Sequence, residues 1–415
     1  MNTTDIPATM KAVVAWGNDI DHVGVRELPV PEPGPNQLLC RVEAAGVCTS
    51  ILKLVAQGKN HTFLNGWDPA EYPIILGDEG SLTLVKAGKN LEKEFIPGTR
   101  YGIQPAADVG PINYKERYNN NAEGMTKTGV GYTLPGNLAQ YILIQEEILE
   151  SGCMLKLPSD DIPHYAVSMA EPVSCVYSAH DRQVHLKKKD RFSPREAEIG
   201  LLRGGVAVVI GAGTMGRIHV EMAMRFKPRV LIVSDLVQSR LDTINKLFGK
   251  KAENLSIRLE TVLPDALTDT AKLLSGGTGA DDVIVAVGVQ QVQQSALSLL
   301  AKGGVANLFG GLPKGKSMLQ VDAIDIHYQD KKIVGSSGGD AYDMIATIEL
   351  IAEGKIDAGN YIYGIGSLEH VPEVLRAMKE GKVEGRAIIY PHAGPADFTV
   401  VDYWSPEDEK KLLSP

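Results

Sequence analysis

This chain of 415 residues has few cysteines, no long apolar run and no excess of basic charge. Its four cysteines, Cys40, Cys48, Cys153 and Cys175, are too few and too scattered for a disulfide framework. No apolar run reaches the roughly 18 residues that span a bilayer, and the start "MNTTDIPATMKAVVAW" lacks the regions of a signal peptide. A formal net charge of −9 argues against a nucleic-acid surface. We therefore expect a soluble, cytoplasmic protein that binds neither membranes nor nucleic acids.

The overall composition is that of a globular protein with more than one core. Hydrophobic residues make up 44% of the chain and charged residues 22%, a balance typical of soluble domains. Because 415 residues exceed what one ordinary core accommodates, we expect two domains.

Two kinds of pattern divide the chain. Between residues 10 and 100, short runs such as "KAVVAW" and "SLTLVKAG" are separated by proline and glycine, which predicts a β-rich region. From residue 206 onward the apolar runs "VAVVIG", "RVLIVSD", "DDVIVAVG" and "VANLFGG" alternate with helical segments. Continuous apolar strands between helices indicate a parallel sheet covered on both faces. The fold class is therefore expected to be α/β.

Several segments fall outside these patterns. Residues 101–135 are polar and asparagine-rich, which predicts a long surface loop, and the charged stretch 185–205 favours a solvated linker over a functional basic patch. The helical stretch that begins near residue 164 contains Pro172, which must start that helix or kink it. The C-terminal "VDYWSPEDEKKLLSP" is interpreted as an ordered surface tail or a subunit contact.

A glycine fingerprint, "VAVVIGAGTMGRIH", follows an apolar strand and opens a helix. In this context Gly211 allows a tight turn, Gly213 lets the backbone approach a pyrophosphate, and Gly216 lets helix and strand pack closely. The free N–H groups at the start of the helix favour phosphates. The alternative is a strand–helix–strand unit whose glycines serve packing alone. The agreement of strand, glycines and helix favours a dinucleotide site.

Asp235 ends the next strand and decides which dinucleotide we expect. A carboxylate there accepts hydrogen bonds from the ribose hydroxyls and repels a 2′-phosphate, which favours NAD over NADP. Arg240 leaves dual use open, although it is expected to face Asp235 or solvent. The predicted cofactor site also includes these neighbours: Thr214, Met215, Val287, Gly288, Phe309 and Gly310.

Two adjacent carboxylates, Asp78 and Glu79, follow the apolar run "YPIIL" and Gly77. Such a pair can bind a metal, hold a substrate hydroxyl or sit solvated in a turn. The other residues of the N-terminal part that suit oxidation of an alcohol are these: Cys48, Thr49, Ser50, Lys53 and Glu171.

At these residues the chain resembles the medium-chain dehydrogenase superfamily, specifically its zinc-dependent polyol and threonine dehydrogenase branch. The matching pieces are "AAGVCTS", "YPIILGDEGS", "GNLAQYILI", "MAEPVSCVYSAH", the glycine fingerprint, "ALSLLAKGGVANLFGG" and "KKIVGSSGG". They occur in the family's order over nearly the whole chain. The segment beginning "HYQDKKIVGSSGG" is most similar to sugar- and polyol-phosphate dehydrogenases such as sorbose-1-phosphate reductases.

The resemblance implies a fold, a reaction and a set of roles. The fold would be a GroES-like β-rich catalytic domain, residues 1–175 and 340–415, with a doubly wound Rossmann domain for NAD at 176–339. The activity would be hydride transfer between NAD and a polyol or sugar, in a homodimer or homotetramer. One catalytic zinc would lie among Cys48, Asp78, Glu79 and Glu171 and polarise the alcohol as a Lewis acid. The family's structural zinc is not expected, because its four closely spaced cysteines are missing.

Two departures from the family pattern concern the catalytic residues. "GDE" stands where the family usually has "GHE", so Asp78 adds a negative charge that weakens Lewis acidity or selects a harder metal such as Mn or Mg. "CTSILK" stands where "CGSDxH" is usual, so Ile51 replaces an aspartate and Lys53 replaces the relay histidine. Ser50 keeps the hydroxyl that, by the resemblance, would contact the substrate oxygen. Lys53 would relay a proton, contact a substrate phosphate or offset the extra carboxylate, and Thr49 and Glu79 complete the catalytic set.

Three alternatives remain open at this point. A metal-free relative would use Lys53 or Glu171 as acid and base. A redox-assisted lyase or epimerase would oxidise a sugar transiently and keep its NAD tightly bound. A non-catalytic dinucleotide sensor would bind NAD without metal or turnover. Bulk NADH formation with a polyol would favour the dehydrogenase over the other two.

Overall fold

The computed structural model describes residues 6–64, 66–112, 125–312 and 315–414. The chain forms two compact units, one of residues 1–172 and 340–415 and the other of residues 173–339. Each is described by itself. Among the described residues, no helix is long and apolar enough to cross a membrane.

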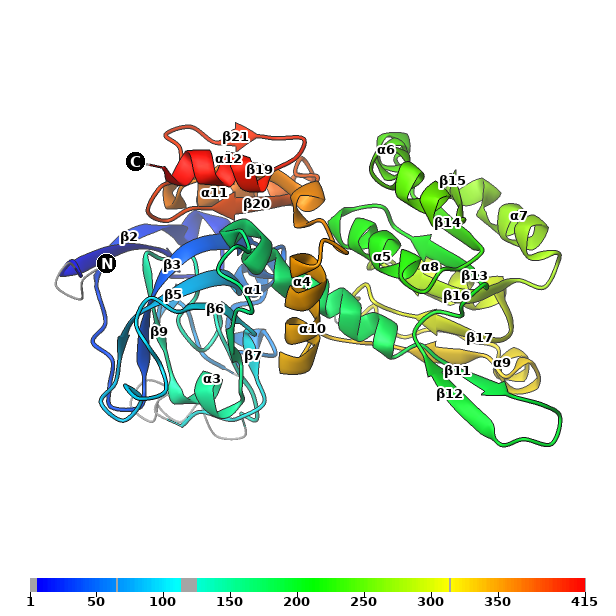
Figure 1. Ribbon diagram of the computed structural model, residues 1–415, viewed down its shortest axis with the longest axis horizontal. Helices are drawn as coiled ribbons and strands as arrows, with labels where there is room; N and C mark the ends of the chain where they lie inside the picture. The colour runs from blue at the N-terminus through cyan, green and yellow to red at the C-terminus, as the bar shows by residue number, and fades with distance from the viewer. Residues whose placement is uncertain (1–5, 65, 113–124, 313–314, 415) are drawn as a thin grey trace. The chain divides into compact units, whose positions relative to one another are not determined.

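The first unit is built on an eight-stranded sheet of order β10-β6-β5-β3-β20-β19-β21, with β9 paired to β3, beside a three-stranded sheet β2-β1-β4 and a short pair β7-β8 (Figure 1). Its strands are β1 (Thr9–Ala15), β2 (Val23–Pro29), β3 (Leu38–Val47), β4 (Ile74–Ile75), β5 (Glu79–Ala87), β6 (Arg100–Ile103), β7 (Ala106–Ala107), β8 (Thr128–Gly129), β9 (Tyr141–Ile144), β10 (Met154–Lys156), β19 (Ile362–Gly366), β20 (Arg386–Ile389) and β21 (Thr399–Val400). Its helices are α1 (Ser50–Gln57), α3 (Glu146–Glu150), α10 (Ala341–Ala352), α11 (Val371–Lys379) and α12 (Pro406–Leu413).

Strands β3 and β5 form the centre of this unit and bring two distant sequence motifs together. They run antiparallel, with Gly46 opposite Glu79. Cys48 therefore follows the end of β3 at the same edge where Asp78 precedes the start of β5. Both strands are mostly buried, so their register is fixed by the core that packs on the sheet.

The second unit has a parallel six-stranded sheet of order β15-β14-β13-β16-β17-β18. Its strands are β13 (Val206–Ile210), β14 (Val230–Ser234), β15 (Arg258–Val262), β16 (Ala280–Val285), β17 (Leu300–Asn307) and β18 (Lys332–Val334). Its helices are α5 (Thr214–Met224), α6 (Gln238–Asn254), α7 (Pro264–Ser275), α8 (Gln290–Ala296) and α9 (Ala323–Gln329). This strand order, 3-2-1-4-5-6 in sequence terms, is that of a doubly wound dinucleotide-binding sheet. The predicted α/β fold class is confirmed.

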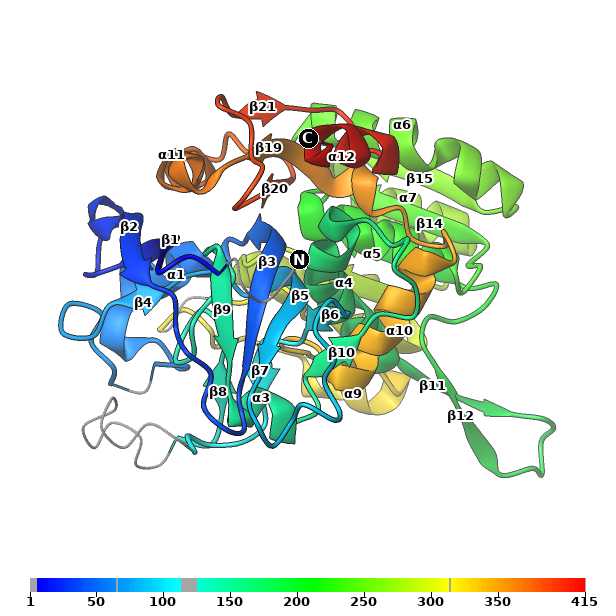
Figure 2. The same cartoon turned by 60° about the vertical axis from the view of Figure 1, so that its left-hand side comes forward.

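The segment expected to be a linker is instead a two-stranded antiparallel ribbon, β11 (Val184–Lys188) and β12 (Arg195–Ile199). Figures 1 and 2 both show it standing out from the second unit. The charged residues that suggested a linker lie on the ribbon and its turn, where Asp190 accepts hydrogen bonds from the backbone N–H groups of Phe192 and Ser193. A solvated charged segment can therefore be a strand when its turn is closed by such side-chain bonds.

Two further expectations concern helices. Pro172 lies inside α4 (His164–Asp181), which begins in the first unit and ends in the second, so the proline does not start the helix. The C-terminal tail contains the ordered helix α12, whose Glu409 is buried. Residues 113–124 of the expected polar loop lie outside the described residues.

Candidate metal centre and dinucleotide site

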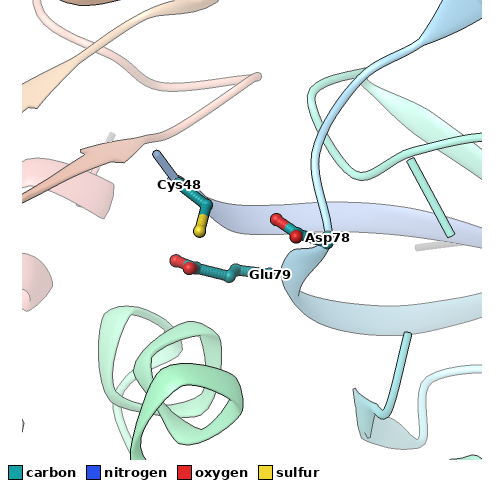
Figure 3. Close-up of side chains that lie close together, drawn as sticks. All are labelled: Cys48, Asp78 and Glu79. Carbon is teal, nitrogen blue, oxygen red and sulfur yellow. The ribbon is translucent and has the colours of Figure 1, made fainter. Parts of the chain in front are cut away.

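Cys48, Asp78 and Glu79 form a cluster in which one ligand atom of each residue lies within 4.8 Å of the others. Figure 3 shows the sulfur of Cys48 beside the carboxylate of Glu79. Asp78 is the residue directly before Glu79, which begins β5. Both carboxylates are buried, and Cys48 is half-buried. The cluster forms because the end of β3 lies beside the start of β5. Its burial decides among the three interpretations of the Asp-Glu pair, which were a metal site, a site for a substrate hydroxyl and a solvated turn. A solvated turn is wrong, because both side chains are inside the protein.

Asp78 is held through one of its two oxygens. The Ser50 hydroxyl donates to Asp78 Oδ2 at 2.8 Å, and the Tyr132 hydroxyl donates to the same oxygen at 3.4 Å. The other oxygen, Oδ1, is buried and has no hydrogen-bond partner among the described residues. Burial raises the pKa of the Asp78 carboxyl above its usual value, although these hydrogen bonds act in the opposite direction.

Glu79 is fully buried and paired with Arg386, the first residue of β20. Arg386 Nη2 lies 3.1 Å from Glu79 Oε1, and its Nη1 donates to the backbone oxygen of Val47 at 3.4 Å. The facing strand leaves room for the carboxylate only because residue 46 is glycine. A Cβ at Gly46 would lie 1.9 Å from Glu79 Oε2. Burial raises the pKa of Glu79 to about 7 despite the ion pair with Arg386.

The charges of this cluster do not balance among the described residues. Cys48, Asp78 and Glu79 supply three acidic groups, and the buried Arg386 supplies one positive charge. Burial, followed by the charge of Asp78, raises the pKa of the Cys48 thiol far above its ordinary value, while Arg386 acts in the opposite direction. Buried carboxylate oxygens that lack partners are costly. The cluster therefore fits a divalent cation in both its charge and its donor atoms.

Glu171, the fourth expected ligand, lies buried on α4. It is not part of the three-residue cluster, but its charge raises the pKa of both Cys48 and Arg386. It is thus near enough to act electrostatically on the site. Its assignment as a ligand stays a prediction.

The structure does not bring Thr49 and Lys53 into the cluster. Both are exposed, Thr49 directly before α1 and Lys53 on it. Lys53 nevertheless acts on its neighbourhood: burial, and then the positive charge of Lys53, lower the pKa of His61. The His61 ring stacks on Tyr132, with ring centres 5.3 Å apart. The charge of Lys53 therefore acts on a ring that stacks on Tyr132, whose hydroxyl donates to Asp78.

Reasoning from sequence missed Arg386, Tyr132 and Gly46. Arg386 is more than 300 positions from its partner, and the only local signal is a lone arginine opening the apolar run "RAII". Tyr132 lies in a segment that was expected to be a surface loop but is buried at this point. Gly46 is one glycine among 43 and has no signal of its own.

In the second unit, the three fingerprint glycines differ in what surrounds them. Gly211 has φ of +106°, and a Cβ there would lie 2.6 Å from Val287 Cγ1. A Cβ at Gly216 would lie 1.8 Å from the backbone oxygen of Gly211. Gly213 has no atom within 4 Å of the position where a Cβ would be, so its side is open. The turn and the close packing explain the outer two glycines, and the open space at Gly213 suits a pyrophosphate.

The start of α5 adds hydrogen-bond donors beside Gly213. Thr214 and Met215 are its first two residues and are half-exposed. The first N–H groups of a helix have no partner within the helix and attract anions.

Asp235 directly follows β14 and is buried. Its Oδ2 accepts a hydrogen bond from the Ala212 N–H at 2.7 Å, and its Oδ1 accepts one from the Val237 N–H at 2.9 Å. The carboxylate is therefore oriented beside the glycine turn. Arg240 Nη1 lies 3.9 Å from Asp235 Oδ1, one of the two orientations expected for it.

The remaining cofactor candidates follow β16 and β17. A Cβ at Gly310 would lie 2.2 Å from the backbone of Val287, and one at Gly288 would lie 2.5 Å from the Gly311 oxygen. These glycines therefore allow two chain segments to touch. Phe309 has its ring edge against His219, with centres 4.5 Å apart.

The family described as "Alcohol dehydrogenase GroES-like domain" matches residues 34–155, and the family described as "Zinc-binding dehydrogenase" matches residues 215–353. The chain belongs to the medium-chain dehydrogenase/reductase superfamily. The GroES-like and Rossmann folds expected from the sequence are confirmed.

Members of this superfamily are similar over most of the chain. A mannitol-1-phosphate 5-dehydrogenase of Aliivibrio fischeri is 29% identical over 391 residues, covering 92% of this chain and 87% of that protein. An L-sorbose 1-phosphate reductase of Klebsiella pneumoniae is 28% identical, covering 85% and 82%. The crystal structure of 2R,3R-butanediol dehydrogenase from Bacillus subtilis has the same fold, with a TM-score of 0.70 at 20% identity over 92% of this chain and 100% of that chain. This medium-chain dehydrogenase/reductase is therefore an oxidoreductase.

Proposed function

We propose that this protein transfers a hydride between NAD(H) and a secondary alcohol or ketone of a polyol, a sugar or a sugar phosphate. The observation that carries the proposal is the buried cluster of Cys48, Asp78 and Glu79. Three relatives of the chain are named for polyol or sugar phosphates, and another is named for the free polyol sorbitol. Residues 1–175 and 340–415 would be the catalytic domain and residues 176–339 the NAD domain, in a homodimer or homotetramer.

One divalent metal ion, zinc in the first instance, fits the cluster. The residues that would hold it are Cys48, Asp78, Glu79 and Glu171, because a thiolate and carboxylate oxygens are zinc ligands. The two buried carboxylate oxygens without partners, Asp78 Oδ1 and Glu79 Oε2, are the atoms that need such a cation. When bound, the metal supplies Lewis acidity toward the substrate oxygen. No structural zinc is proposed.

The protein's own residues would handle the proton and hold the ligands. Ser50 already donates to Asp78, so it can accept the hydroxyl proton of the substrate while its own proton moves toward that carboxylate. Arg386 holds Glu79 through Oε1, and Glu79 Oε2 stays available to the metal ion. Burial of both carboxylates keeps bulk water away from the groups that titrate during the reaction.

NAD is the proposed cofactor because of Asp235. Its carboxylate is held beside the glycine turn by two backbone N–H groups, and a ribose with free hydroxyls can donate to it. A 2′-phosphate would meet a negative charge there. Arg240 already lies near Asp235 and offsets only part of that negative charge.

The test combines metal content with turnover. We expect elemental analysis of the purified protein to find about one metal ion per chain, and Asp78→Ala to lose it. The matched control is Glu71→Ala, which removes an exposed carboxylate from the same unit. NADH formation is then followed with polyols and their phosphates. Absence of metal from the wild type, or bound NAD with no net turnover of any of them, would overturn the proposal.

A further inference from the structure

The Tyr132 hydroxyl reaches an atom of the metal cluster that Ser50 also holds. Both hydroxyls donate to Asp78 Oδ2, Ser50 at 2.8 Å and Tyr132 through a longer hydrogen bond of 3.4 Å. Asp78 Oδ1 is buried and has no partner among the described residues. The Asp78 carboxylate therefore has one oxygen engaged by two hydroxyls and one oxygen left for a cation.

The ring of Tyr132 is held on two sides. The His61 ring stacks on it with ring centres 5.3 Å apart, and the Phe63 ring meets it edge-on with centres 5.2 Å apart. These two partners are also tied to each other, because the Phe63 N–H donates to His61 Nδ1 at 3.2 Å. Tyr132 is only 8% exposed. Its hydroxyl therefore has little freedom to turn away from Asp78.

The backbone that carries Tyr132 is attached to the residue directly before Asp78. A Cβ at Gly131 would lie 2.7 Å from the backbone of Gly77, so the two chain segments touch at this point. A few residues further on, the Asn137 N–H donates to the Gly77 oxygen at 2.8 Å. Backbone and ring together fix Tyr132 relative to the start of β5, where Asp78 stands.

We propose that Tyr132 is a positioning residue of the metal centre, whose hydroxyl restrains Asp78 Oδ2 so that Asp78 presents Oδ1 to the ion. This inference rests on the proposed function, because it assigns a role within the same site. Hydrogen-bond partners orient the ligands of a metal, and their loss costs roughly 10- to 100-fold in affinity. The Ser50 hydroxyl also takes part in the proposed proton transfer, whereas Tyr132 keeps Oδ2 in place throughout. The alternative is a tyrosine that serves packing alone.

Tyr132→Phe keeps the ring and removes the hydroxyl, so metal affinity separates the two roles. The full-length protein is stripped of metal and titrated with zinc against a competing chelator, and urea unfolding of the metal-free variant shows that its fold is intact. We expect the zinc dissociation constant to rise about tenfold, a loss of about 1.4 kcal/mol. The matched control is Tyr141→Phe, which removes a hydroxyl from an equally buried tyrosine in another apolar cluster of the same unit and should leave the constant unchanged.

Cobalt in place of zinc gives a second readout, which a packing role would not move. The visible bands of bound cobalt report its ligands, so they should change in Tyr132→Phe and not in Tyr141→Phe. Ser50→Ala combined with Tyr132→Phe should raise the zinc constant by more than the product of the two single changes, because each single variant leaves Oδ2 one donor.

The outcomes that contradict this role differ from those that contradict the proposed function. A wild-type zinc constant and cobalt spectrum in Tyr132→Phe, or equal losses in Tyr132→Phe and Tyr141→Phe, would refute the positioning role alone. A wild-type protein that binds no divalent metal would refute the proposed function and the positioning role with it.

Discussion

Asp78 stands at the position where the sequence resemblance implies a histidine ligand in the family. It places a second carboxylate beside Cys48 and Glu79, so the expected ligands carry more negative charge than a set with a neutral imidazole. Carboxylates favour harder metals, whereas thiolate and imidazole suit zinc. The proposed consequence is a site that accepts manganese or magnesium more readily than its relatives do.

Asp78→His tests this consequence of charge. We expect the variant to hold zinc more tightly against a chelator and to bind less manganese, because it exchanges an anionic oxygen for a neutral nitrogen. Equilibrium dialysis against mixed metals with elemental analysis measures the ratio. A zinc-to-manganese ratio equal to that of the wild type would show that residue 78 does not ligate the metal.

Arg386 pairs with Glu79 inside the protein, so removal of Arg386 leaves the Glu79 carboxylate buried without an opposite charge. Arg386→Leu should lower the free energy of unfolding by about 3–5 kcal/mol, since it leaves a buried carboxylate without its partner. Adding Glu79→Gln should recover part of this loss. Denaturant unfolding of the two single variants and the double variant, with metal removed from all, measures the coupling; additive effects would contradict the pairing.

Lys53 has a function to test although it lies outside the cluster. Its charge already acts on His61, and no ion pair is formed by Lys53 among the described residues. If it contacts a substrate phosphate, Lys53→Ala should raise KM for a polyol phosphate by more than for the free polyol. Lys59→Ala is the matched control, because Lys59 faces Asp68 instead. Equal effects on the two substrates would remove Lys53 from phosphate binding.

At the scale of elements, helix α12 stabilises the start of α4. Glu409 on α12 accepts hydrogen bonds from the backbone N–H groups of His164 and Tyr165, at 2.7 and 2.8 Å, and from the Tyr390 hydroxyl at 2.8 Å. A carboxylate at a helix N-terminus satisfies N–H groups that lack partners and interacts favourably with the helix dipole. The helix that it holds carries Glu171.

Removal of this carboxylate should therefore destabilise the first unit. We expect Glu409→Ala to lower the free energy of unfolding by about 2–4 kcal/mol, because several hydrogen bonds to a charged group are lost. Glu407→Ala, an exposed glutamate in the first turn of the same helix, should change it by less than about 0.5 kcal/mol. Similar losses in both variants would mean that the helix, and not its buried carboxylate, stabilises α4.

The elements differ in how far sequence could predict them. The parallel sheet could be predicted, because short runs of four or five consecutive apolar residues alternate there with helical segments. The ribbon could not, since its apolar residues face solvent and its alternation is hidden among charges. In the site, Cys48 and the Asp78–Glu79 pair stand in short local motifs, but their partner Arg386 comes from a strand that only the folded sheet places beside them. Long-range pairing of this kind leaves no local signal.

At the scale of the whole molecule, the buried His180 and His219 and the half-buried His164 link stability to pH. Burial is the main cause that lowers the pKa of His219 to about 3 and that of His164 to about 4, and it takes the pKa of His180 well below its usual value. His180 Nε2 and His219 Nδ1 lie 3.0 Å apart, and Arg225 adds a positive charge near them. These imidazoles are neutral in the folded protein at every pH near neutrality.

Since each folded pKa lies below the unfolded value of about 6.5, the unfolded state binds more protons once the pH falls below that value. The contribution of these histidines to stability should be constant with pH above about 6.5 and should fall below it by about 1.4 kcal/mol per pH unit for each histidine. His219→Gln keeps a hydrogen-bonding side chain but removes one of these groups, so its slope should be smaller by that amount, while the exposed His327→Gln should keep the wild-type slope. Urea unfolding across this range compares the three proteins, and acid effects on the metal ligands cancel because they are common to all. A slope in His219→Gln equal to that of the wild type would mean that the buried pair does not set the acid limit of this fold.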